Sequence, residues 1–217
     1  MATEKIKQEI RKFLSGLGIK IVGFGEVPHQ IQPLEINLDF SRAVVFGVPL
    51  SKSVLQTITS QPTLIYKHHY KTVNWILDQS AFHLARFIED MDKRALAIPA
   101  SQTVDWEAQK GHISHKALGQ AAGLGFIGRN GLLIHPVYGA GVRYASVLTD
   151  LDFSPDPEVT DSCGECRRCI EACPAEAISE KGVDLKRCLA QLKEFSRIRG
   201  IGQYICGVCV KVCNGQN

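Results

Sequence analysis

The sequence predicts an α/β domain over residues 1–155, followed by a small cysteine-rich α+β domain over residues 156–217. Two observations indicate this division. Segments with helical and strand-like patterns alternate through the first part, as they do in α/β domains. All eight cysteines lie at or beyond Cys163, which is the sharpest change of composition along the chain. The segment DFSPDPEVTDS, residues 152–162, contains two prolines and several acidic residues and is typical of a linker.

The first elements follow from the spacing of apolar residues. TEKIKQEIRKFLS has apolar residues at helical spacing, which predicts a helix over 3–15 that ends at Gly16 and Gly18. IKIVGFG, 19–25, has the pattern of a strand. RAVVFGVPL, 42–50, is a continuous apolar run with β-branched residues, and it predicts a buried strand.

The later elements of the first part continue the alternation. The segment 71–94 has apolar positions at helical spacing, which predicts a long helix. A short strand is expected over ALAIPA, 95–100, and a helix over SHKALGQAAG, 114–123. GLLIHP, 131–136, and VRYASVLTDL, 142–151, have the apolar and β-branched content of strands.

The cysteines have the spacing of a bacterial ferredoxin. C-x2-C-x2-C-x3-C-P is the run that supplies three ligands to one [4Fe–4S] cluster and the fourth to its neighbour. A second set must therefore exist, and the later cysteines provide it with one member displaced upstream onto DLKRCLAQLKEF. The crossed rule assigns cluster one to Cys163, Cys166, Cys169 and Cys213, and cluster two to Cys173, Cys188, Cys206 and Cys209.

Zinc and disulfides explain this pattern less well. A zinc ribbon needs two C-x2-C pairs with a spacer, and it does not need the run that ends in Pro174. Disulfides are typical of short secreted chains. The N-terminus is charged and has no apolar core of a signal peptide, and no apolar run reaches the length of a membrane span. We therefore expect a soluble, cytoplasmic protein without a membrane partner.

The net charge of +3 is too small to indicate nucleic acid by itself. GLGFIG matches a dinucleotide-binding motif, but a helical stretch precedes it and a strand follows, which is the reverse of the required order. We reject that site and expect its glycines to allow a close backbone approach to the core or to a flat cofactor. In the polar segment 101–116, Asp105 is either a proton donor or a helix N-cap or solvated carboxylate. His112 and His115 are metal ligands or, with better odds, surface or capping residues. Tyr70 either delivers a proton or packs.

The order of motifs resembles the epoxyqueuosine reductases and their paralogues, which are relatives of the reductive dehalogenases. The resemblance lies in HKALGQAAGLGFIGRNGLLIHPVYGAGVRYASVLTDLDF, CGECRRCIEACPAEAI, DLKRCLAQL and CGVCVKVC. It covers most of the chain from about Leu96 to Cys213, and the N-terminal part more loosely.

The resemblance implies a cobalamin-binding domain of nitroreductase or flavin-reductase type, which receives electrons from a ferredoxin-like two-cluster domain. Cobalt would be reduced to Co(I) and attack the substrate, while an acid on the opposite side supplies a proton. The family's aspartate falls onto Asp105 and its tyrosine onto Tyr70. The turn near the corrin comprises Gly123, Gly125, Phe126, Gly128, Arg129 and Asn130.

Three departures from the family affect the expected substrate. The stretch after Asp105 reads WEAQKGHISHK instead of a Pro-Leu-Leu-Glu-Arg-like segment, and Cys213 lacks the usual Pro-Trp-Asn tail. The sequence also ends four residues after Cys213. We therefore expect a paralogue that reduces a small molecule and takes electrons from a ferredoxin or flavodoxin, with tRNA an unlikely substrate.

Three other functions remain open from the sequence. The chain is an electron carrier or a corrinoid-reactivating partner with no substrate of its own, or it binds a flavin in place of cobalamin, or it is a genuine tRNA epoxyqueuosine reductase. Each shares the two-cluster domain with the leading hypothesis, so the cysteines do not distinguish them.

Overall fold

The computed structural model describes residues 2–29, 35–36, 39–106, 108–213 and 215. This part of the chain is mixed α/β structure, and it forms two compact units. The first unit comprises Met1–Val48, Asn74–Gly125 and Arg143–Val159, and the second comprises Pro49–Val73, Phe126–Val142 and Thr160–Asn217. The predicted boundary between residues 155 and 156 concerns functional domains and stays a prediction.

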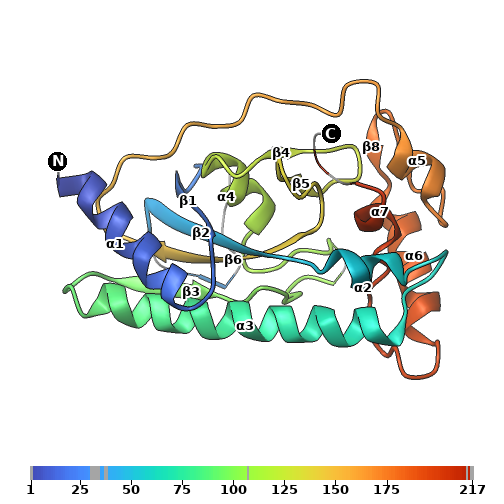
Figure 1. Cartoon of the computed structure of the whole chain (residues 1–217), viewed down its shortest axis with the longest axis horizontal. Coiled ribbons are helices and arrows are strands. Elements are labelled where there is room, and N and C mark those ends of the chain that lie inside the picture. Colours follow the sequence, from blue (N-terminus) through green and yellow to red (C-terminus); the bar gives the residue numbers. More distant parts are fainter. Residues whose placement is uncertain (1, 30–34, 37–38, 107, 214, 216–217) are drawn as a thin grey trace. The chain divides into compact units, whose positions relative to one another are not determined.

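The first unit is built on a four-stranded sheet in the order β1-β2-β6-β3 (Figure 1). Its strands are β1 (Ile21–Glu26), β2 (Arg42–Pro49), β6 (Val142–Thr149) and β3 (Ala95–Ile98). β1 and β2 are antiparallel, with Ile21 opposite Gly47, and β3 and β6 are antiparallel, with Ala95 opposite Thr149. Strands far apart in sequence therefore meet at the centre of the sheet, where β2 and β6 are neighbours.

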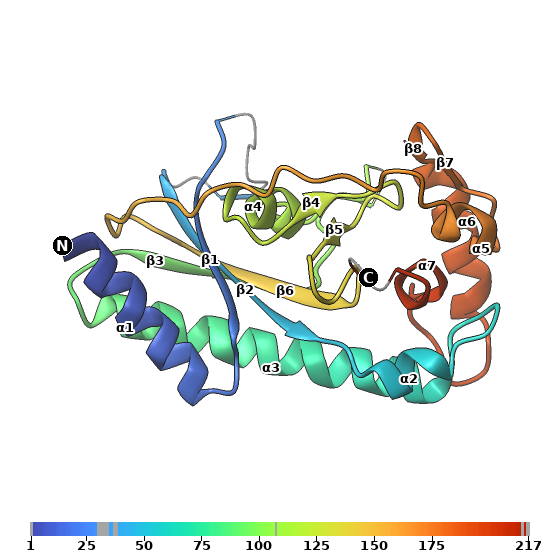
Figure 2. The same ribbon diagram turned by 45° about the horizontal axis from the view of Figure 1, so that its top comes forward.

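Helices cover this sheet within the first unit. α1 (Ala2–Gly16) lies beside the later part of α3 (Leu64–Glu89), where Phe13 stacks on Phe87 at 4.5 Å between ring centroids (Figure 2). α4 (His115–Ala121) packs on β1 so closely that a side chain at Gly23 would collide with the Ala122 carbonyl oxygen. The largest fully buried side chains of the unit include Leu14, Phe24, Phe46, Leu77, Leu84, Ile88, Leu118, Leu148 and Phe153.

Most predicted elements of the first part form, with shifted ends. α3 begins at Leu64 rather than residue 71, because the Thr63 hydroxyl accepts a hydrogen bond from the Tyr66 amide at 3.2 Å and caps the helix. It ends at Glu89, shortly before Asp92 takes a positive φ of 57°. The strand predicted over 131–136 is reduced to β5 (Leu133–Ile134), which pairs with β4 (Phe126–Ile127).

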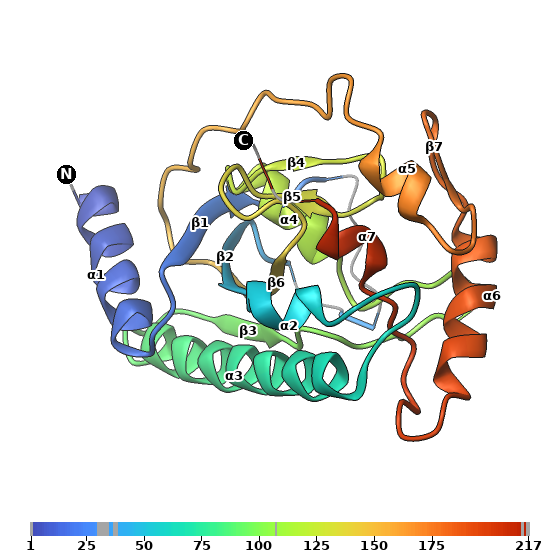
Figure 3. The same ribbon diagram turned by 45° about the vertical axis from the view of Figure 1, so that its right-hand side comes forward.

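The second unit carries all eight cysteines, and most of its elements are short (Figure 3). Its longest complete helix is α6 (Leu185–Ser196). Asp184 caps α6 by accepting hydrogen bonds from the amides of Lys186 and Arg187 at 2.9 and 3.1 Å. The other elements are α2 (Lys52–Gln56), the first part of α3, β4, β5, α5 (Arg168–Ala172), the hairpin of β7 (Ile178–Ser179) and β8 (Gly182–Val183), and α7 (Val208–Lys211).

No helix in the described ranges combines the length and the hydropathy that crossing a membrane requires.

The segment predicted as a linker is fixed to the first unit by Asp156. Its carboxylate lies 2.6 Å from the Lys7 ammonium and 3.0 Å from the Arg11 guanidinium, and it accepts a hydrogen bond from the Phe24 amide at 3.2 Å. Phe153 packs edge-on against Phe24 at 5.1 Å. The segment therefore lacks regular secondary structure but is not a free tether.

Asp156→Asn should destabilise the first unit, because the half-buried carboxylate serves two cations and the Lys7 side chain is only 7% exposed. We expect a loss of about 2 kcal/mol, typical of a hydrogen bond to a charged group, measured as a lower thermal midpoint by circular dichroism. Asp152→Asn is the control, since the Asp152 side chain is 86% exposed and lies 3.9 Å from Arg42. Equal shifts in both variants would contradict the role of Asp156.

Candidate functional site

The first cysteine loop is a tight turn that leads into a helix. The Cys166 amide donates to the Cys163 carbonyl at 3.0 Å, and Gly164 between them has a positive φ of 48°. Cys169 lies in the first turn of α5 and is buried, whereas Cys166 is exposed. This loop thus presents thiols with very different access to solvent.

Cys169 and Cys213 identify the first group of thiols. Burial raises the pKa of the Cys169 thiol, and charges on Cys163, Cys213 and Cys166 raise it further. Burial likewise raises the pKa of Cys213, which also feels Cys163 and Cys166. A thiol from the end of the cysteine segment is therefore an electrostatic neighbour of the three thiols at its beginning.

The remaining four cysteines form a second group. Burial raises the pKa of Cys188, and Cys173 raises it further. Burial also raises the pKa of Cys206 to about 11, and Cys188 and Cys173 add to the effect. The pKa of Cys209 is raised most strongly, mainly by burial. Charges on neighbouring thiols raise it further, namely those of Cys206, Cys188, Cys173 and Cys169. The Cys169–Cys209 coupling links the two groups, consistent with the packing of α5 on α7.

Each of these two groups contains four thiols, the number of protein ligands that a [4Fe–4S] cubane requires. Among the residues that the structure describes, no three His, Cys, Asp or Glu side chains are arranged to hold one metal ion. The four thiolates around a cubane each bind a different iron, so they do not need to converge on one point. Raised thiol pKa values also mean that cluster binding would release protons from these cysteines.

Arg129 holds the first cysteine loop from a different segment of the second unit. Its guanidinium donates to the carbonyl oxygens of Gly164 and Cys166 at 2.8 and 3.0 Å, and its Nε donates to Glu180 at 2.6 Å. The neighbouring Gly128 leaves no room for a side chain, because an added Cβ would lie 2.7 Å from Ile134. The glycine-rich turn therefore supports the cysteine loop.

Two other glycines bring distant segments against the cysteines. Gly139, with a φ of 58°, lies against the Cys213 carbonyl, where any side chain would collide. Gly207, with a φ of 85°, begins α7, and an added Cβ would come within 2.8 Å of Ile58 and Tyr66. The sequence pattern identified the cysteines but not these contacts, which no local motif marks.

The residues predicted near a corrin are found mostly in protein contacts. Gly123 packs against the Pro157 carbonyl, and Phe126 is buried with Ile134 and Ala140. Asn130 is buried; its Oδ1 accepts from the Leu132 amide at 3.1 Å, while its Nδ2 has no partner within the described ranges. Of the three remaining members, Gly125 has a φ of 152°, and Gly128 and Arg129 make the contacts given above. Asn130 thus offers the one unsatisfied polar atom of this set to a bound group.

The predicted proton donors lie in different units. In the first unit, Asp105 forms an isolated bridge with Lys110 and accepts a hydrogen bond from the Ala108 amide at 2.8 Å. In the second, Tyr70 lies on α3 with its ring 6.2 Å from the ring of Tyr66. Neither arrangement by itself decides between a catalytic and a structural role.

The histidines of the polar segment have protein partners. His115 uses both ring nitrogens, one with the Ser146 hydroxyl and one with the Pro99 carbonyl, each at 2.8 Å. Since a carbonyl only accepts, the proton is on Nε2, and burial lowers the pKa of this histidine to about 4. His112 contacts the Gln102 side chain at 3.1 Å. His115 therefore has no ring nitrogen left for a metal.

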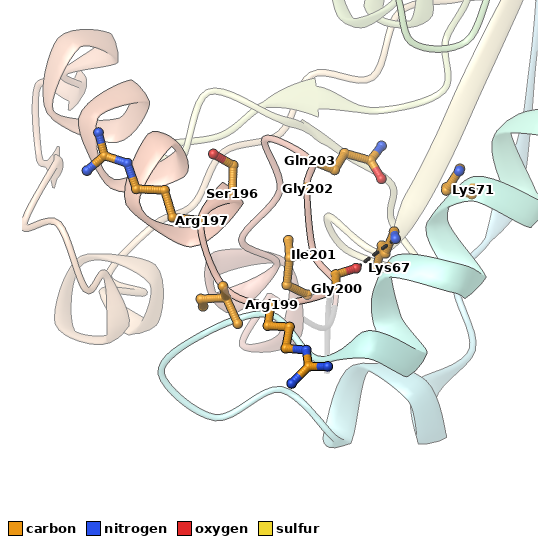
Figure 4. Close-up of a pocket in the computed structure, with 10 residues that line it drawn as sticks. Lys67, Lys71, Ser196, Arg197, Arg199, Gly200, Ile201, Gly202 and Gln203 are labelled. Carbon is orange, nitrogen blue, oxygen red and sulfur yellow. Dashed lines mark hydrogen bonds between the residues drawn. The ribbon is translucent and has the colours of Figure 1, made fainter.

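Sequence reasoning did not identify a basic cavity in the second unit. It has a volume of about 480 Å³ and lies between the first part of α3 and the loop that follows α6 (Figure 4). Its charged lining residues come from segments 125 or more positions apart, which explains why no motif marked them; they are Lys67, Lys71, Arg197 and Arg199.

Arg129→Lys should weaken the first cysteine loop, because an ammonium cannot donate to two carbonyls and Glu180 in the geometry of a guanidinium. After anaerobic reconstitution with iron and sulfide, we expect lower iron content and a several-fold faster loss of visible absorbance in air. Arg167→Lys is the matched control, since Arg167 is exposed and lies 3.4 Å from Glu180. The same decay rate in both variants would remove Arg129 from this role.

Comparison with known proteins identifies the lineage of the chain, although no family model matches it. It is 33% identical to epoxyqueuosine reductase from Staphylococcus aureus, over 97% of this chain and 64% of the relative. It is 34% identical to the Bacillus subtilis enzyme, over 48% of this chain and 29% of the relative. The chain thus spans about 29–64% of the length of these curated relatives.

Solved structures share the fold. A catabolic reductive dehalogenase in complex with 3-bromo-4-hydroxybenzoic acid has a TM-score of 0.78 and 20% identity, over 94% of this chain and 31% of that one. Epoxyqueuosine reductase from Streptococcus thermophilus has a TM-score of 0.66 and 22% identity, over 98% of this chain and 68% of that one. The resemblance expected from the motifs is confirmed, and the chain belongs to the epoxyqueuosine reductase-like family.

Proposed function

We propose that this chain is an iron–sulfur oxidoreductase that passes low-potential electrons through two [4Fe–4S] clusters to a bound cobalamin, which reduces a small substrate. In this proposal the first part of the chain is a cobalamin-binding domain of flavin-reductase type and the cysteine segment is a ferredoxin-like domain. The observation that carries the proposal is the separation of the eight thiols into two groups of neighbours.

The two groups correspond to the crossed ligand sets. Cys163, Cys166, Cys169 and Cys213 would hold cluster one, and Cys173, Cys188, Cys206 and Cys209 would hold cluster two. All eight are free thiols in a chain with no disulfide. The two sets lie in one compact unit, where α5 packs on α7 and the charge of Cys169 contributes to the raised pKa of Cys209; this closeness supports electron transfer between the two proposed clusters.

Support for cobalamin comes from the relatives and from Asn130. One structural neighbour is a reductive dehalogenase whose description concerns B12-dependent dehalogenation. In this chain, the buried Asn130 Nδ2 is a donor without a partner among the described residues, and buried donors are rarely left unpaired. A bound corrin would supply a reduced, nucleophilic cobalt, while the protein positions it and excludes water.

Asp105 and Tyr70 are the proposed proton donors to the substrate. The Oδ1 atom of Asp105 accepts a hydrogen bond from the Ala108 amide within its own turn, and a proton for the substrate would be carried on Oδ2. A solved structure of the Bacillus subtilis epoxyqueuosine reductase is described with its catalytic aspartate loop swung out of the active site. A loop that carries the acid into and out of a site is consistent with the exposed Trp106 that follows Asp105.

Reduction of epoxyqueuosine in tRNA is the second candidate function. It is favoured by the alignment to an epoxyqueuosine reductase over 97% of this chain, and by a structural neighbour solved with an epoxyqueuosine-modified tRNA stem loop. The sequence made tRNA an unlikely partner because of three departures from the family: the stretch after Asp105, the missing tail after Cys213 and the end of the sequence. The last of these carries no weight, because the chain spans only part of its relatives. The two substrates are separated by assay.

Single Cys→Ser variants should reveal the crossed sets. Cys173→Ser and Cys188→Ser should both lose cluster two, so iron falls from about eight to about four per chain and the same EPR signal remains. Cys169→Ser and Cys213→Ser should retain the complementary signal. Ala190→Ser, an exposed change on the same helix as Cys188, should keep both clusters.

The decisive result is which variants lose the same cluster. If Cys173→Ser instead matches Cys169→Ser, each run of cysteines binds its own cluster and the crossed assignment is wrong. If all four variants keep about eight irons, these thiols are not ligands.

Anaerobic reconstitution with hydroxocobalamin tests the corrin directly. We expect about one corrin retained per chain after removal of the excess, with a base-off Co(II) EPR signal after mild reduction. Asp105→Asn should retain the same iron and corrin, because Asp105 acts on substrate. Its turnover should fall about 100-fold or more, as for loss of a general acid.

Turnover is measured with two probes, an epoxyqueuosine-modified RNA stem loop and 3-bromo-4-hydroxybenzoic acid. Retained flavin in place of corrin would replace the cofactor in the proposal, and clusters with neither cofactor would indicate an electron carrier. Unchanged turnover in Asp105→Asn would make Asp105 structural.

A further inference from the structure

The basic cavity of the second unit has a surplus of positive charge. Lys67 donates to the Gly200 carbonyl at 2.7 Å, and Arg197 pairs with Glu194 at 2.7 Å. Lys71 and Arg199 are exposed and have no ion-pair partner within the described ranges. The cavity therefore presents four cations against one carboxylate and attracts negative charge.

The arrangement of these cations favours an extended acidic surface over one small anion. Figure 4 shows the side chains of Arg197 and Arg199 pointing in different directions, so they do not converge on a single group. Apolar surface adjoins them: Leu64 is 51% exposed and lies against Gly200, and Tyr204, 41% exposed, follows the loop. Mixed cationic and exposed apolar surface is typical of a protein-docking face.

The lining of the cavity does not favour nucleic acid. Its ten lining residues include no aromatic side chain on which a base could stack, and the exposed Tyr204 lies just outside the lining. An RNA stem loop is therefore included as the competing ligand in the test.

The cavity lies close in the chain to the second cysteine group. Its loop joins α6, which carries Cys188, to Cys206. Gln203, at the end of the lining, is three residues before Cys206, so their Cα atoms are at most about 11 Å apart. A partner bound at the cavity would therefore lie near these thiols, within the same compact unit.

From this we propose that the basic cavity is the docking surface for a small acidic one-electron carrier protein. The inference rests on the proposed function, since it requires cluster two. In the step that docking permits, one electron leaves the reduced carrier, which becomes oxidised by one electron, and reduces cluster two from 2+ to 1+; no bond or proton is exchanged. The weak, salt-sensitive contact expected suits a transient electron-transfer complex.

Binding of a reduced plant-type [2Fe–2S] ferredoxin to the cluster-loaded chain tests this surface by calorimetry at low and at physiological salt. We expect salt-sensitive binding and at least about tenfold weaker affinity for Lys71→Glu/Arg199→Glu, since rim charges mainly steer association. Lys181→Glu is the control, because Lys181 is exposed in the same unit but outside the cavity. Lys181→Glu changes the net charge half as much as the double variant does. It should bind the ferredoxin almost as tightly as the parent chain does.

The controls separate this inference from the proposed function. Iron content and reduction by dithionite should be the same in parent and variants, and a chain that holds no clusters would refute the function itself. If clusters form and dithionite reduces them, yet the parent does not bind the carrier, only the docking surface is refuted. An equal loss of ferredoxin affinity in Lys181→Glu would also refute the docking surface. Binding of an RNA stem loop to the parent chain, lost in the double variant, would refute it as well.

Discussion

The arrangement of the second unit depends on the interaction of Arg129 with the first cysteine loop. That loop has almost no secondary structure of its own, and its carbonyl oxygens would otherwise point to solvent. One guanidinium, fixed by Glu180, binds two of them in a geometry that only arginine provides. The glycines beside it and opposite Cys213 allow the surrounding backbone to approach. Thiols are thereby positioned by contacts from outside the cysteine segment.

The spacing of the cysteines alone predicts the two groups of thiols that are electrostatic neighbours in the structure, whereas their role as cluster ligands stays a prediction. The contacts of Arg129, Gly139 and Gly207 arise only when distant segments meet, and no periodicity records them. The start of α3 was missed for a different reason: its first two turns mix Lys, His and Tyr, which hides the helical pattern, and the Thr63 cap became evident only from its hydrogen bond.

The relatives and the contacts describe two separable parts of the proposed chemistry. The proposed electron path would use thiols whose electrostatic neighbours match the two groups that the cysteine spacing predicts. The substrate side rests on Asp105, whose present hydrogen bond is local, and on a segment, 101–116, that differs from the family pattern. Proteins that share a fold and an electron path often differ in the loops that contact substrate, since loops tolerate change and carry function.

The closeness of Cys213 to Cys163, Cys166 and Cys169 has a consequence for biosynthesis. A ribosome adds about 5–20 residues per second, so Cys213 emerges several seconds after Cys169, which precedes it by 44 positions. During that interval the first three thiols have no fourth partner, and the exposed Cys166 is open to oxidation. In the proposed ligand set, the full coordination of cluster one therefore forms only after the nascent chain has passed Cys213, and the first three thiols are sensitive to oxygen before then.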